Sequence, residues 1–124
     1  MTAQLEYVCE KCKKPITSGK RGFLWLDLTD VRDYKRELGV WVKAGRVGRP
    51  PLKPRWMAHH RACIRVHEPI RSISVDSVRT LSSLTRETAA LMETLGDDLA
   101  LTDWLDFMRY VAYGEADWFN GTAR

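Results

Sequence analysis

All three cysteines of the chain and one histidine form two closely spaced pairs that together could hold a metal ion. The first pair is Cys9 and Cys12, and the second is His60 and Cys63, with two residues between the members of each pair. Three thiolates and one imidazole make the closed tetrahedral shell of a structural zinc site, with no position left for a catalytic water. We therefore expect a structural Zn²⁺ ion. His59, with three residues before Cys63, is the alternative to His60.

A disulfide framework fits these cysteines less well than a metal site does. Their number is odd, so at least one thiol would stay unpaired. Two pairs with ligand spacing that use every cysteine would be an unusual coincidence for separate, reduced residues. The cysteine pattern therefore favours a metal-built fold in a reducing compartment.

The two half-motifs, Cys-x2-Cys and His-x2-Cys, resemble zinc-binding modules of the LIM and treble-clef type. In that family a knuckle supplies two ligands and the start of a helix supplies two more, so the resemblance implies a zinc knuckle with a β-hairpin over about residues 7–66. The 47 residues between Cys12 and His60 are more than the compact family spacing and imply an insertion. With Trp56 before the histidine and Thr-Asp-Trp in the tail, the chain is also similar to small zinc proteins of actinobacteria and their phages.

The segments around the ligands predict short strands and turns. An apolar run at 23–28 predicts a strand. Apolar residues at helical spacing over 30–43 predict an amphipathic helix, although Gly39 and two valines leave open a shorter helix followed by a strand at 40–43. The second ligand pair is expected in the first turn of a helix that ends before Pro69.

The C-terminal part predicts helices. After a short strand at 72–75, apolar residues recur on one face over roughly 77–95, and Gly96 is a natural stop. Thr102 is expected to cap a last helix that ends near Gly114. Because the connection is short, the two helices should form an antiparallel hairpin.

These elements predict an α+β protein in two parts. Residues 1–75 would be a small treble-clef-like zinc module with an inserted basic loop at about 43–55, and residues 76–124 an acidic helical hairpin packed on it. The first part carries 16 Lys and Arg against 7 Asp and Glu, and the second carries 4 against 9. This asymmetry indicates two surfaces that meet different partners or attract each other.

The basic loop predicts contacts with nucleic-acid phosphates. It contains three prolines, which exclude a regular helix or a central strand. Its cationic side chains are the candidate phosphate contacts: Lys43, Arg46, Arg49, Lys53 and Arg55. The alternative interpretation is an ordinary solvated loop. On the first interpretation the chain is a nucleic-acid-binding accessory or regulatory protein.

A second hypothesis makes the chain a protein-interaction adaptor, encoded by a phage, in which zinc only builds the scaffold. The acidic C-terminal helices, or Trp118 and Phe119 in the tail, would then contact a partner protein. Loss of binding at raised salt distinguishes the two hypotheses, because phosphate contacts are strongly salt-dependent.

No catalytic constellation is evident, and we expect no enzymatic activity and no small-molecule substrate. The adjacent histidines invite comparison with HNH nucleases, but the other residues of that motif are not found at suitable places. The first residues carry neither a basic start nor an apolar stretch, and no run is long enough to span a bilayer. We therefore expect a cytoplasmic protein without a membrane partner.

Overall fold

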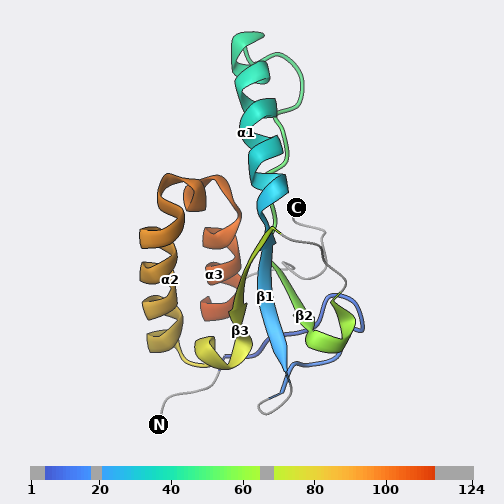
Figure 1. The fold of residues 1–124 in the computed structure, drawn as a ribbon, viewed down its shortest axis with the longest axis vertical. Helices are drawn as coiled ribbons and strands as arrows, with labels where there is room; N and C mark the ends of the chain where they lie inside the picture. The colour runs from blue at the N-terminus through green and yellow to red at the C-terminus, as the bar shows by residue number, and fades with distance from the viewer. Residues whose placement is uncertain (1–4, 18–20, 65–68, 114–124) are drawn as a thin grey trace.

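The computed structural model describes residues 5–17, 21–64 and 69–113, and it shows an α+β fold (Figure 1). Within these residues a three-stranded antiparallel sheet is combined with three α-helices and three short 3-10 helices. In chain order the elements are β1 (Gly22–Asp27), α1 (Leu28–Lys43), β2 (Met57–His60), η1 (Arg61–Cys63), β3 (Ile70–Ser74), η2 (Val75–Val78), α2 (Leu81–Leu95), η3 (Gly96–Leu101) and α3 (Trp104–Tyr113). None of the described helices is long and apolar enough to cross a membrane.

The sheet has the order β2-β1-β3, so the first strand lies in the middle. The expected strand at 23–28 is present with a shift of one residue, and the expected strand at 72–75 lies at Ile70–Ser74. Successive side chains of a strand point to opposite faces. Leu24, paired with Ala58 and Ile73, lies on the inner face, which is buried against the core. We call the opposite side of the sheet the outer face.

One hydrophobic core joins the two parts that the charge pattern separates. It contains Tyr7 and Cys9 from the N-terminal turn at 7–16, which we call the knuckle. It also contains Leu84, Leu91 and Phe107 from the C-terminal helices. The Tyr7 ring lies 6.0 Å from the Phe107 ring, and its hydroxyl donates to the Val78 carbonyl. The helical hairpin therefore packs directly on the knuckle and the sheet.

Helix α1 projects from the body of the molecule and is longer than the sequence suggested (Figure 1). Asp27 caps the N-terminus of the helix, because its carboxylate accepts a hydrogen bond from the Thr29 N–H at 2.8 Å. The alternative strand at 40–43 is wrong, because the helix continues to Lys43. Valines lower helix propensity by only tenths of a kcal/mol, and none of the described strands lies beside the projecting segment to pair with it. We call α1 and the returning residues 44–55 the arm.

Helices α2 and α3 lie side by side and run in opposite directions (Figure 1), as the expected helical hairpin requires. Helix α2 begins at Leu81 rather than near residue 77, because Thr80 and Ser83 form a capping box and the preceding turn is the 3-10 helix η2. The Thr102 hydroxyl accepts the Trp104 N–H at 3.3 Å, which supports its expected role at the start of α3.

Candidate metal centre

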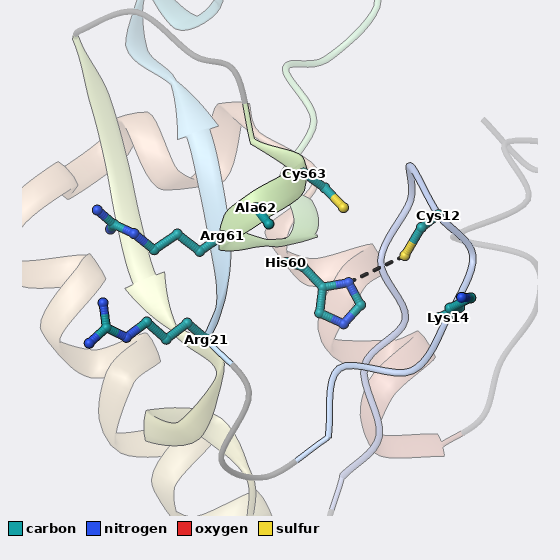
Figure 2. Close-up of a pocket in the computed structure, with 7 residues that line it drawn as sticks. All are labelled: Cys12, Lys14, Arg21, His60, Arg61, Ala62 and Cys63. Atoms are coloured by element: carbon teal, nitrogen blue, oxygen red, sulfur yellow. Dashed lines mark hydrogen bonds between the residues drawn. The ribbon is translucent and has the colours of Figure 1, made fainter.

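The fold brings together the four residues that the spacing singled out. The ligand atoms of Cys9, Cys12, His60 and Cys63 all lie within 4.8 Å of one another. Figure 2 shows the His60 ring directed at the Cys12 sulfur, with Cys63 facing the same space. Two distant segments, the knuckle and the end of β2, supply two ligands each. The cluster is therefore a site that could hold a metal ion.

The knuckle is a tight turn that aims backbone N–H groups at a sulfur. The Lys13 N–H donates to the Cys9 carbonyl at 2.9 Å, and Lys13 takes a positive φ of 63° to close the turn. Burial alone would raise the pKa of the Cys9 thiol. Backbone N–H groups of Cys12, His60 and Lys11 donate to its sulfur and bring the pKa down to about 6. The knuckle therefore favours the thiolate, the form that binds metal.

The cluster also concentrates negative charge that a cation would offset. Burial, followed by the nearby sulfurs of Cys9 and Cys12, raises the pKa of the Cys63 thiol. Thiolates this close repel one another, so the last one ionises reluctantly in the metal-free chain. A divalent cation between the sulfurs would remove this repulsion. The donor set and its electrostatics therefore fit a metal ion.

The His60 ring is held in the orientation that a ligand needs. Its Nδ1 lies 3.3 Å from the Cys12 sulfur, and its Nε2 lies 3.2 Å from the Pro15 carbonyl oxygen. When Nε2–H donates to this carbonyl, the Nδ1 lone pair faces the cluster, which is the outer hydrogen bond typical of metal-bound histidines. The Pro15 carbonyl therefore selects the ligand tautomer.

The second ligand pair does not lie in the first turn of a helix, so this prediction is wrong. His60 is the last residue of β2, and Cys63 ends the 3-10 helix η1. The strand is fixed by its pairing with β1, in which His60 lies opposite Gly22. The single turn that follows is enough to bring Cys63 back to the cluster. The two motifs thus meet without the helix that the treble-clef resemblance implies.

His59 points away from the cluster, because neighbouring residues of a strand face opposite sides. Its Nδ1 accepts the Trp25 indole N–H at 2.9 Å, and the two rings lie 5.8 Å apart on the outer face. Burial, followed by the positive charges of Lys11, His60 and Lys13, lowers the pKa of His59. The described geometry therefore favours His60 as the ligand.

Alanine variants of the two histidines should behave differently. We expect His60→Ala to lose most of the bound metal, because one of four ligands is removed, whereas His59→Ala should keep one ion per chain. Metal content measured by atomic emission on the purified variants tests this. Metal loss in His59→Ala with retention in His60→Ala would reverse the assignment.

Glu10, inside the first ligand pair, braces the knuckle against β2. One carboxylate oxygen accepts the Ala58 N–H at 3.2 Å, and the other accepts from the Arg55 guanidinium at 2.7 Å. The Glu10 N–H donates to the Ala58 carbonyl at 2.9 Å. Arg55, expected to contact phosphates, is thus half-buried in an ion pair. Sequence spacing carried no signal for this pair, because 44 residues separate its members.

The other predicted phosphate contacts are spread along the arm. Lys43 ends α1, and Arg46 and Arg49 follow it in the returning segment; all three are exposed, and Figure 1 shows this end of α1 pointing away from the sheet. Lys53 is exposed beside a hollow that also includes Asp30, Asp33 and Glu37. The structure therefore does not gather the five residues at one place. Trp118 and Phe119 lie outside the described residues.

A cationic hollow beside the metal centre was not anticipated from the sequence. It measures about 710 Å³ and is lined by three of the ligands together with Lys14, Arg21, Arg61 and Ala62 (Figure 2). Among its described lining residues there is no carboxylate. Arg61 lies within the second ligand pair, whereas Arg21 lies outside both pairs, and only the strand pairing shows that they are neighbours.

Comparisons with protein-family models, with curated proteins and with solved structures gave no match to this chain.

Proposed function

We propose that the cluster holds a Zn²⁺ ion that stabilises the fold, and that the chain is an accessory or regulatory protein that binds nucleic acid. Three thiolates and an imidazole suit zinc, with bonds of roughly 2.3 Å to sulfur that place the sulfurs of a tetrahedron about 3.8 Å apart. The 4.8 Å limit on the ligand atoms is compatible with this spacing. The ion would leave no open position, so its role is structural.

One observation supports the nucleic-acid part of the proposal. In the described part of the chain, a set of exposed cationic side chains makes no ion pair within 4.0 Å, at both the metal end and the tip of the arm. The set comprises Lys11, Lys13, Lys14, Arg21, Lys43, Arg46, Arg49, Lys53 and Arg61. Free surface cations attract phosphates and release the counterions bound to them, which drives association.

Salt-dependent binding tests the proposal. We expect the zinc-loaded chain to bind a fluorescein-labelled DNA in an anisotropy titration, with an affinity that falls steeply between about 50 and 200 mM salt. For duplex DNA, the slope of the logarithm of the affinity against the logarithm of the salt concentration should become shallower by about 2 in Arg46→Ala/Arg49→Ala, if both residues contact phosphates.

The matched control for this titration is Arg32→Ala/Arg86→Ala. It removes the same charge from exposed positions of α1 and α2 outside the arm tip and the hollow. We expect it to keep the wild-type salt dependence. Absence of binding by the wild-type chain to duplex and single-stranded DNA and RNA at low salt would exclude the proposed function.

A second candidate function, the protein-interaction adaptor, is favoured by a hollow between α2 and α3. This hollow of about 420 Å³ is lined mainly by apolar side chains, and its polar lining comprises Thr88 and Thr102, the carboxylates of Asp97 and Asp106, and one cation, Lys53. Met92 and Leu105 at its edge are 62% and 60% exposed. An apolar surface with an acidic rim suits a basic, amphipathic partner segment. If the chain binds no nucleic acid, the protein-interaction adaptor becomes the preferred function.

A further inference from the structure

Two arginines beside the metal centre are held next to each other by the sheet. Arg21 directly precedes β1 and Arg61 directly follows β2, and the Arg61 N–H donates to the Arg21 carbonyl at 2.9 Å. Figure 2 shows both side chains extending in the same direction across the sheet, away from His60. The backbone pairing therefore places the two arginines side by side, with their side chains on one face of the sheet.

This arrangement leaves positive charge without a partner. Both arginines are exposed, and neither makes an ion pair with a carboxylate of the described residues. Lys14 lines the other side of the same hollow. A Zn²⁺ ion with three thiolates carries a net charge of about −1, so three cations exceed what the metal centre would neutralise. Two like charges held together are stabilised when an anion binds between them.

The outer face next to the arginines carries aromatic rings. Phe23 lies two residues after Arg21 on β1, and His59 lies two residues before Arg61 on β2. These two residues are direct cross-strand partners, and both are half-buried. Proteins that bind single-stranded nucleic acid combine such aromatic surfaces, on which bases stack, with cations that contact the backbone.

We propose that Arg21 and Arg61 form a clamp for one phosphate group of a single-stranded nucleic acid, with the adjoining base on Phe23 and His59. Planar guanidinium groups suit this role, because each can donate two parallel hydrogen bonds to phosphate oxygens. That the phosphate belongs to a nucleic acid rests on the proposed function, whereas the clamp itself rests on the side-by-side placement of the two arginines. The phosphate could be a backbone diester or a terminal monoester.

The experiment compares wild type, Arg21→Gln/Arg61→Gln and the control Arg32→Gln/Arg86→Gln, each shown to contain one metal ion per chain. Anisotropy titrations use labelled oligothymidylate with and without a 5′-phosphate, and the corresponding duplex. We expect the clamp variant to bind single strands about tenfold more weakly and its salt slope to fall by about 0.7, because the clamp contacts one phosphate and each phosphate contact on a single strand contributes about 0.7. The control should match wild type.

Further arms identify the ligand. A gain in affinity from the 5′-phosphate, lost in the clamp variant, would assign a terminal monoester, and equal affinities would assign a backbone diester. Phe23→Leu keeps an apolar side chain but removes the ring, so it should weaken single-strand binding by about tenfold, as stacking on one base predicts. Duplex binding should change little.

The outcomes separate this inference from the proposed function. If the clamp variant binds single strands as the wild type does, the clamp is wrong and the proposed function survives through other cations. If no nucleic acid binds, the proposed function fails, and calorimetry with inorganic pyrophosphate then decides on the anion site. Pyrophosphate binding that the clamp variant loses would uphold the anion site, and its absence in wild type would overturn it.

Discussion

Removing the metal ion will unfold the whole described chain in one transition, including the C-terminal helices. Structural zinc contributes on the order of 10 kcal/mol to small zinc folds, comparable with the entire stability of a domain. The ligand Cys9 belongs to the same buried core as Leu84, Leu91 and Phe107, so the knuckle cannot open without exposing α2 and α3. Loss of the ion therefore removes support from both parts.

Far-UV circular dichroism and an amide NMR spectrum recorded before and after treatment with EDTA test this prediction. We expect the helical signal and the dispersion of the amide signals to be lost together and to return when zinc is added. A chelated chain that keeps folded helices α2 and α3 while only the knuckle signals collapse would show two independent units instead.

Replacement of Trp56 by alanine should cost about 3 to 5 kcal/mol in the free energy of unfolding. The side chain is fully buried, and its ring meets the Trp104 ring edge-on at 4.8 Å. Its indole N–H donates to the Thr102 hydroxyl at 3.0 Å, and its backbone N–H donates to the Asp103 carboxylate at 2.8 Å. Trp56 thus connects the start of β2 to the start of α3.

Urea denaturation of the zinc-loaded chain measures this loss. Trp41→Ala is the matched control, because Trp41 lies half-buried on the arm, where its indole N–H donates to the Gly48 carbonyl at 3.4 Å. We expect the control to cost less than about 1 kcal/mol. Equal losses in both variants would mean that the Trp56 contacts with α3 do not determine stability.

Local spacing was sufficient to predict which four side chains form the candidate metal cluster and where the C-terminal helices lie. Cys9 and Cys12 are held by one short turn, so their separation in the sequence determines their geometry. Helices α2 and α3 repeat apolar residues over several turns and carry clear end signals, such as the Gly96 stop. In each case the residues that decide the structure are near neighbours in the chain.

Features that depend on distant residues could not be predicted in the same way. His60 and Cys63 have helical spacing, but pairing with β1 extends the backbone up to His60 and leaves room for only a 3-10 turn. The ion pair between Arg55 and Glu10 arises because backbone contacts hold the knuckle against β2. The neighbouring positions of Arg21 and Arg61 likewise follow from the sheet register, which no single segment contains.

The metal content of the purified chain tests the central claim most directly. Elemental analysis of wild type, Cys63→Ser and His60→Ala, each prepared without an added metal-binding tag, should give one zinc ion per wild-type chain and far less in the two variants. That stoichiometry would place the ion in the cluster of three cysteines and His60. A folded wild-type chain that contains no zinc or other metal would contradict the account.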